Sequence, residues 1–184
     1  MRRFSLLLVV LLLCGCSSEA GVTEGLRLRK ELLSSAGCTF DMLIHADYGQ
    51  AIYDFKVRCS ADAAGAMEFA LVEPENIAGI GGYIEAGSGH ISFDDVVLAL
   101  PPLAEGELMP VFAPWIFLNT LRQGYIKDQG TLEDKIVLTI MDSYEEDALM
   151  LRVYLDEQGL PSFCDVFWQG RGVLSMRVEN FCFL

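Results

Sequence analysis

The chain has 184 residues, of which 13 are Lys or Arg and 26 are Asp or Glu, so its formal net charge at pH 7 is −13. Such a chain repels the phosphates of nucleic acids, which excludes a nucleic-acid-binding function. Hydrophobic residues make up 52% of the sequence. That content excludes a disordered acidic tail and suits one domain with a sizeable core.

The N-terminus has the pattern of an export signal. Arg2 and Arg3 precede an apolar run, residues 4–13, that only Ser5 interrupts. This run is shorter than the about 20 apolar residues that a membrane-spanning helix needs, and it has the length of the apolar region of a secretory signal. We therefore predict a signal peptide over residues 1–15.

Cys16 follows this segment directly. The preceding residues Leu13, Cys14 and Gly15 resemble the bacterial lipobox, in which an aliphatic and a small residue stand before a cysteine. In proteins with a lipobox the cysteine thiol receives diacylglycerol, and cleavage then makes that cysteine the first residue. The resemblance implies lipidation of Cys16, a lipidated tether over 16–22, and an extracytoplasmic position on the cell membrane. The alternative is a plain secretory signal with incidental cysteines.

Residues 23–184 form one predicted domain, which begins with a helix. The segment 23–36 reads TEGLRLRKELLSSA, with a threonine as its N-terminal cap and a glycine after its end. Arg27, Arg29 and Lys30 cluster on this helix, near the predicted lipid anchor. Two interpretations fit: contact with anionic lipid head groups, or a solvated helix face.

Residues 38–59, CTFDMLIHADYGQAIYDFKVRC, alternate apolar and polar side chains and predict a β-hairpin. A turn centred between Tyr48 and Gly49 makes every facing pair on one side apolar. This register places Cys38 opposite Cys59, at a separation that a disulfide can span. The two interpretations are a disulfide, which would stabilise the fold by roughly 3 kcal/mol, and two buried free thiols.

More strands and a second helix follow. Met67, Phe69 and Leu71 predict a third strand, and residues 83–100 read as two further strand pairs joined by turns. The segment 113–124, APWIFLNTLRQG, predicts a helix with a proline in its first turn and a glycine at its end.

The C-terminal third predicts an antiparallel sheet with one apolar face. In the last hairpin the predicted register places Asp165 opposite Arg177 and Cys164 opposite Val178, with a three-residue loop at 170–172. The apolar rows are Ile136, Leu138 and Ile140; Leu149, Leu151, Val153 and Leu155; Leu160, Cys164, Val166 and Trp168; and Leu174, Met176 and Val178.

Strand order and helix placement resemble the Lol lipoprotein carrier and receptor superfamily, LolA and LolB. The segments VEPENIAGI, HISFDDVVLALPPL and PVFAPWIFLNTLRQGYI also look like the GerS-like germination lipoproteins of spore-forming Gram-positive bacteria. The resemblance implies an α+β fold. A strongly curved antiparallel meander of about nine strands would form a half-barrel, covered by an N-terminal helix and an inserted helix. In the Lol superfamily the apolar interior holds acyl chains.

No catalytic arrangement stands out in the sequence. His45 and His90 are the only histidines, and neither has a cysteine or carboxylate at metal-ligand spacing. Residues 142–147, DSYEED, do not match an EF-hand loop and indicate a solvated acidic turn. No glycine-rich phosphate loop or GxSxG motif is present. We therefore predict a chain that is not an enzyme and has no metal or cofactor.

Two functions fit these features. In the first, an apolar ligand, either a lipid or the acyl chain of a lipoprotein, binds between the curved sheet and the inserted helix. The alternative for the aromatic residues of this region is a closed core without a cavity. The candidate cavity residues are Phe55, Phe69, Phe93, Trp115, Phe117, Leu118 and Trp168.

The second function is that of an adaptor that binds a protein without any ligand. The GerS-like resemblance implies it, because those lipoproteins support a cell-wall amidase during spore cortex modification. Phe163 and Phe167 alternate with Asp165, which is typical of a half-exposed strand. These two phenylalanines are the candidate residues for binding a partner.

Overall fold

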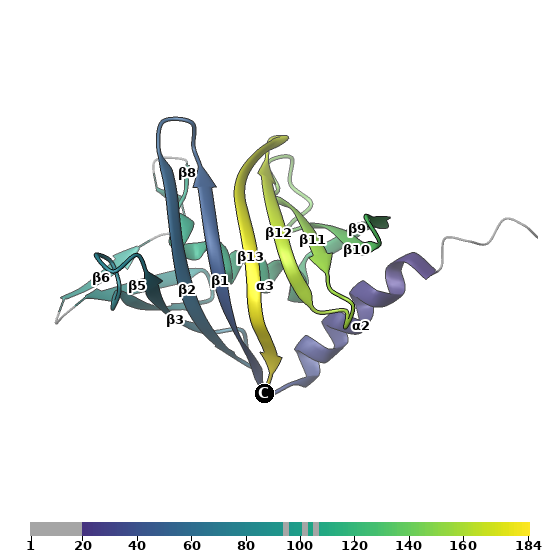
Figure 1. The fold of residues 1–184 in the computed structure, drawn as a ribbon, viewed down its shortest axis with the longest axis horizontal. Helices are drawn as coiled ribbons and strands as arrows, with labels where there is room; N and C mark the ends of the chain where they lie inside the picture. Colours follow the sequence, from purple (N-terminus) through teal and green to yellow (C-terminus); the bar gives the residue numbers. More distant parts are fainter. Residues whose placement is uncertain (1–19, 94–95, 101–102, 105–106) are drawn as a thin grey trace, which may run out of the picture.

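The fold is an α+β arrangement in which helices pack on the apolar face of one large antiparallel sheet (Figure 1). The computed structural model describes residues 20–93, 96–100, 103–104 and 107–184. The predicted signal peptide, Cys16 and the first part of the tether lie outside the described residues. No helix in the described ranges is both long and apolar enough to cross a membrane.

The main sheet has 11 strands in the order β6-β5-β4-β3-β2-β1-β13-β12-β11-β10-β9, and β7 and β8 form a separate pair. The described elements, in chain order, are α2 (Ala20–Ser34), β1 (Gly37–Asp47), β2 (Ile52–Asp62), β3 (Met67–Glu73), β4 (Gly81–Glu85), β5 (Ser88–Phe93), β6 (Val96–Leu100), β7 (Leu103–Ala104), β8 (Glu107–Leu108), a 3₁₀ turn (Pro110–Phe112), α3 (Ala113–Gln123), β9 (Tyr125–Leu132), β10 (Lys135–Met141), β11 (Met150–Leu155), β12 (Pro161–Trp168) and β13 (Arg171–Phe183).

The first and last strands pair in the middle of the sheet. From β1 the chain runs strand by strand to the edge strand β6, crosses through α3 to the opposite edge at β9, and returns strand by strand to β13. β13 lies antiparallel to β1, and Leu184 donates its amide hydrogen to the carbonyl of Gly37 over 2.9 Å. The predicted meander with an inserted helix is therefore confirmed.

The sheet is larger than the predicted nine strands, in part because the sequence gives no signal for β9. Its sequence, YIKDQGTL, lacks apolar alternation, and most of its side chains are exposed. An edge strand of this kind pairs on one side only and does not need to bury a complete face. Hydrophobic periodicity, which finds half-buried strands, therefore misses it.

The space between the sheet and the helices is a filled core. Alternate residues along the central strands point into it, and α2 and α3 supply the second layer. Full burial of each large apolar side chain contributes about 1.5–3 kcal/mol. The largest fully buried side chains are Phe40, Phe112, Phe117, Leu28, Leu32, Met42, Ile44, Met67, Ile84, Leu118, Leu138 and Ile140.

Phe112 fixes the N-terminal end of α3 on the sheet. Its side chain is 1% exposed, and its ring lies directly against the place where a Cβ atom of Gly89 would stand. The absence of a side chain at this point of β5 allows the ring to approach the backbone. Pro114 in the first turn of α3 has the backbone angle that a helix start requires.

The register of the first hairpin differs from the prediction by two residues. Cys38 pairs with Ala61 and Phe40 pairs with Cys59. The loop centre moves by one residue because Gly49 adopts a positive φ of 80° and donates its amide hydrogen to the Asp47 carboxylate over 2.7 Å. A shift of two residues keeps the same side chains on the same face, so the apolar pattern does not detect it.

The prediction that Cys38 faces Cys59 is therefore wrong. Both residues lie in the core, at 2% and 1% exposed, and both are free thiols in the structure. Burial raises the pKa of the Cys38 thiol to about 11 and that of Cys59 well above its ordinary value. The structure therefore contains two buried free thiols at these positions and not a disulfide.

The last hairpin is also shifted by two residues from its predicted register. Arg177 faces Phe163, and Asp165 faces Ser175, whose hydroxyl donates to the aspartate over 2.7 Å. The turn consists of Gln169 and Gly170, which both have positive φ, and not of a three-residue loop. A bulge at Val173 of β13 absorbs the remaining offset, because the consecutive residues Val166 and Phe167 pair with Leu174 and Gly172.

Two arginines tie the helices and the strands together. Arg29 of α2 donates to the carbonyl oxygens of Leu121 and Gly124, at 2.8 and 2.6 Å, and so satisfies groups at the C-terminal end of α3. Arg122 of α3 donates to the carbonyl of Ala63 over 2.7 Å. These bonds fix the C-terminal end of α3, whereas Phe112 fixes its N-terminal end.

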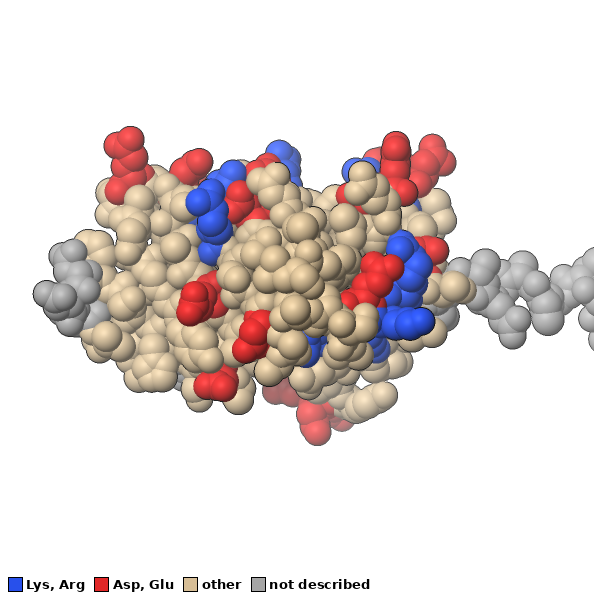
Figure 2. All heavy atoms as spheres, turned by 90° about the horizontal axis from the view of Figure 1, so that it is seen from below, with Lys and Arg blue, Asp and Glu red and all other residues tan. Residues whose placement is uncertain are grey.

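The basic residues of α2 are used in different ways, and contact of this helix with lipid head groups stays a prediction. Arg27 pairs with Glu24 and Glu31, at 2.7 and 3.1 Å, and Arg29 is used inside the fold, whereas Lys30 is exposed. Figure 2 shows Lys and Arg side chains interspersed with Asp and Glu on this view of the surface.

Gly89→Ala is expected to lower the free energy of unfolding by about 1–3 kcal/mol, because the added methyl group overlaps the Phe112 ring. The matched control is Gly130→Ala on β9, where none of the described atoms lies within 4 Å of the added Cβ atom. The control should change stability by less than about 1 kcal/mol. Chemical denaturation measures both values, and equal stability of the two variants would contradict the close contact.

Thiol alkylation at mildly alkaline pH is expected to modify Cys182 alone in the folded chain, because Cys38, Cys59 and Cys164 are buried and their thiol pKa values are raised. The measurement uses a chain that begins at residue 16 with Cys16→Ala, and mass spectrometry counts the adducts. Unfolding without reductant should then expose all these thiols. Two cysteines that react only after reduction would establish the disulfide instead.

Candidate ligand pocket

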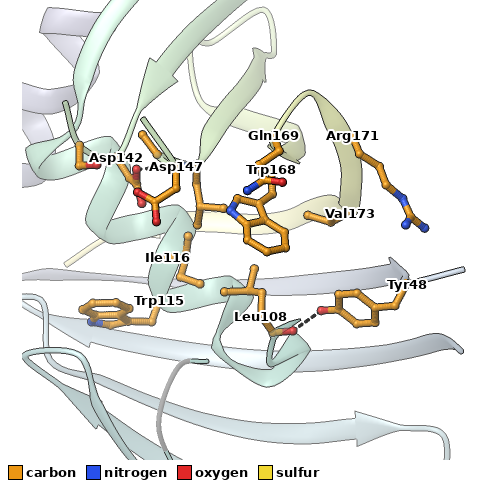
Figure 3. Close-up of a pocket in the computed structure, with 13 residues that line it drawn as sticks. Tyr48, Leu108, Trp115, Ile116, Asp142, Asp147, Trp168, Gln169, Arg171 and Val173 are labelled. Carbon is orange, nitrogen blue, oxygen red and sulfur yellow. Dashed lines mark hydrogen bonds between the residues drawn. The ribbon is translucent and has the colours of Figure 1, made fainter. Parts of the chain in front are cut away.

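A pocket of about 520 Å³ opens at one end of the sheet, beside the N-terminal end of α3. Trp115 and Ile116 of α3, Leu108 of β8, the tip of the β1–β2 hairpin, the β12–β13 turn and the β10–β11 loop surround it (Figure 3). This volume falls within the ~300–1,000 Å³ that is usual for small-molecule sites. The segments that line the pocket are far apart in the sequence, so the pocket exists only when the tertiary structure brings them together.

The floor of the pocket is apolar. Leu108, Ile116 and Val173 are only 8%, 6% and 7% exposed. The two tryptophans of the chain, Trp115 and Trp168, are half-buried and form much of the wall. Figure 3 shows the Trp168 indole in the middle of the pocket. Half-buried indoles present an apolar face to a ligand together with one N–H donor.

One end of the pocket is acidic. Asp142 and Asp147 of the β10–β11 loop lie there, beyond Trp168 (Figure 3). The Asp142 carboxylate accepts the amide hydrogen of Leu149 over 2.8 Å, which fixes the base of this loop. Nearby protein atoms displace water from the Asp142 carboxyl group, and this desolvation raises its pKa. Hydrogen bonds from Leu149 and Ser143 act in the opposite direction and offset only part of the shift.

The opposite end is closed by the tips of two hairpins. The Tyr48 hydroxyl donates to the carbonyl of Leu108 and connects the β1–β2 tip to β8. Arg171 begins β13, and its Nη2 atom lies 3.0 Å from the place where a Cβ atom of Gly49 would stand. The hairpin tips therefore touch at this wall, and Arg171 is separated from the two aspartates by Trp168 (Figure 3).

The structure brings together two of the predicted cavity residues, Trp115 and Trp168. Phe117 and Leu118 are 0% and 1% exposed and belong to the filled core, and so does Phe69 at 5%. These three side chains therefore do not line the pocket.

The other two predicted cavity residues lie elsewhere. Phe93, at the end of β5, is 51% exposed. Phe55 borders a second, wider groove of about 580 Å³, which Lys56, Phe163 and Arg177 also line. Phe163 points away from the core, because it alternates with buried residues of β12.

Both predicted partner-binding residues are partly covered by neighbours on the outer face of the sheet. The guanidinium carbon of Arg152 lies 5.1 Å from the centre of the Phe167 ring. The ring centre of Phe163 lies 5.6 Å from that of Tyr154. These contacts stabilise the outer face, and a role of either phenylalanine in binding a partner stays a prediction.

Eleven of the thirteen pocket residues were not singled out as site residues from the sequence, among them the three charged residues and Tyr48. Asp142 and Asp147 belong to the segment interpreted as a solvated turn, Tyr48 stands in the β1–β2 loop, and Arg171 is the first residue of β13. No local pattern marks them, because only the pairing of distant strands brings their loops together. Within the described ranges, no three His, Cys, Asp or Glu side chains converge as ligands for a metal ion.

No protein-family model matches the chain, and no curated protein matches its sequence. Solved structures do match. A LolA superfamily protein from Nitrosomonas europaea has 8% identity and a TM-score of 0.46, with 85% of this chain and 92% of that chain covered.

Two further solved structures have comparable similarity to the chain. A conserved protein from Thermus thermophilus has 11% identity and a TM-score of 0.49, with 89% of this chain and 87% of that chain covered. Lipoprotein LppX from Mycobacterium tuberculosis has 8% identity and a TM-score of 0.42, with coverages of 88% and 93%. At these identities the similarity concerns the fold alone.

Proposed function

We propose that the chain is a membrane-anchored extracytoplasmic lipoprotein that binds an apolar ligand, a lipid or the acyl chain of a lipoprotein, and performs no catalysis. The observation that carries this proposal is the pocket beside α3, whose buried apolar floor is completed by the only two tryptophans of the chain. Apolar side chains that line an accessible cavity gain free energy when a ligand displaces water from them.

The ligand would bind in the pocket at the end of the sheet and would not extend into the space between α3 and the strands. Phe112, Phe117 and Leu118 fill the space between α3 and the strands. A volume of about 520 Å³ is therefore available for one apolar chain or a small lipid segment, while a polar end stays at the mouth of the pocket.

Lipid attachment at Cys16 supports the membrane location. The N-terminal sequence has a basic start, a short apolar run and a cysteine after a small residue, in the order that a lipobox requires. Two acyl chains on that cysteine, at ~0.8 kcal/mol for each buried methylene, would hold the domain stably at a bilayer.

An adaptor function is the second candidate. The groove that contains Phe163 is open and lies on the face of the sheet away from the helices, where a protein partner such as a cell-wall enzyme has access. An adaptor of this kind would need no ligand in the pocket beside α3.

Ala148→Phe is expected to abolish ligand binding, because residue 148 lines the pocket from a loop and a phenyl ring there would occupy its volume. Native mass spectrometry of the chain from residue 16, with Cys16→Ala and purified from a lipid-containing host, measures bound mass that disappears on denaturation.

The matched control for this experiment is Ala78→Phe, at an exposed position in the β3–β4 loop. It should keep the lipid mass of the parent. A parent chain that carries no bound lipid under these conditions would contradict the carrier function and would support the adaptor function.

Cys16→Ala is expected to move the protein from the membrane fraction to the soluble fraction, because the acyl chains attach to this thiol. Fractionation of cells that produce the parent and the variant measures the change, and incorporation of labelled fatty acid should be lost in parallel. Cys14→Ala serves as the control and should stay with the membrane. Retention of the Cys16 variant in the membrane fraction would show that another feature anchors the chain.

A further inference from the structure

We infer that the ligand of this pocket is an amphiphile with a cationic ammonium head group. The head group lies at the acidic end of the pocket, beside Asp142 and Asp147, and the apolar tail of the ligand lies against Trp115 and Trp168. This inference rests on the proposed function and specifies the class of ligand.

The acidic end provides the first argument. Two carboxylates of one loop line the same end of the pocket, and Figure 3 shows them on the far side of Trp168 from Arg171. The hydrogen bonds that Asp142 accepts from Leu149 and Ser143 favour its ionised form, but they offset only part of its desolvation. Desolvation penalises the ionised form of Asp142, and a cation bound beside it would relieve this penalty. An anionic head group would increase it.

The α3 terminus provides the second argument. The N-terminal amides of a helix often bind anions, and α3 begins beside the pocket. Here the first of these amides are already used: the amide hydrogens of Phe112 and Ala113 are donated to the carbonyls of Met109 and Pro110, and Pro114 has no amide hydrogen. The start of α3 therefore offers little to an anionic head group.

The tryptophans provide the third argument. The faces of indole rings are negative and attract cations, with a gain of about 0.5–2 kcal/mol for each contact. Trp115 and Trp168 are both half-buried in the wall. The overall charge of −13 also raises the local concentration of cations relative to anions. Among the described residues that line the pocket, Arg171 is the one basic side chain, and it is exposed at the opposite end, beside Gly49.

The test compares three probes with the same twelve-carbon tail: dodecyltrimethylammonium, dodecanoate and dodecyl maltoside, each below its micelle concentration. Because both tryptophans of the chain line the pocket, intrinsic tryptophan fluorescence reports on the pocket without a label. The chain from residue 16 with Cys16→Ala is titrated with each probe. We expect dodecyltrimethylammonium to bind at least about fivefold more tightly than dodecanoate.

The double variant Asp142→Asn and Asp147→Asn should lower the affinity for dodecyltrimethylammonium by about fivefold and leave that for dodecyl maltoside unchanged. Asparagine keeps an oxygen that can accept the Leu149 amide hydrogen. The matched control is Glu145→Gln with Glu146→Gln, which removes the same charge from exposed positions of the same loop that do not line the pocket. It should change no affinity by more than about twofold.

Equal binding of the ammonium and carboxylate probes would overturn the inference and leave the proposed apolar pocket intact. An equal loss in both double variants would also overturn it, because the effect would then come from net charge and not from the pocket. A fluorescence response to none of the probes would contradict the proposed function itself.

Discussion

The pairing of β1 with β13 is the contact on which the rest of the structure depends. It joins the first and the last strands of the sheet, so that each half of the chain can extend outward to its own edge. At one end it brings Gly37 and Leu184 together. At the other end it places two hairpin tips side by side, where Arg171 contacts Gly49. The same pairing therefore closes the fold and builds one wall of the pocket.

Helix α3 separates the filled core of the protein from the open pocket. Phe112 on Gly89 and the two bonds from Arg29 hold its opposite ends, while Phe117 between them fills the core. The helix therefore has little freedom to tilt away from the sheet. Only its first turn, with Trp115, borders an opening. A site of this form suits a ligand whose tail is buried and whose polar end remains at the surface.

The hydrophobic pattern predicted most strands and both helices, but not the register of the hairpins. Cys38 was expected opposite Cys59 and faces Ala61, because a shift of two residues leaves every side chain on its own face. Loop geometry at Gly49 decides between these registers. The edge strand β9 was not predicted for a different reason. Most of its side chains are exposed, so its sequence does not need to alternate apolar and polar residues.

The sequence by itself determined the acidic charge, the apolar face of the sheet and the aromatic character of the site, and it predicts an export signal at the N-terminus. Trp115 and Trp168 were recognised because large aromatic residues are conspicuous in any chain. Only the tertiary structure decided that Phe117 fills the core while Trp168 lines a pocket, and that Asp142 lies beside it. Burial depends on which distant segments meet, and the free energy of that packing is spread over contacts that no local pattern encodes.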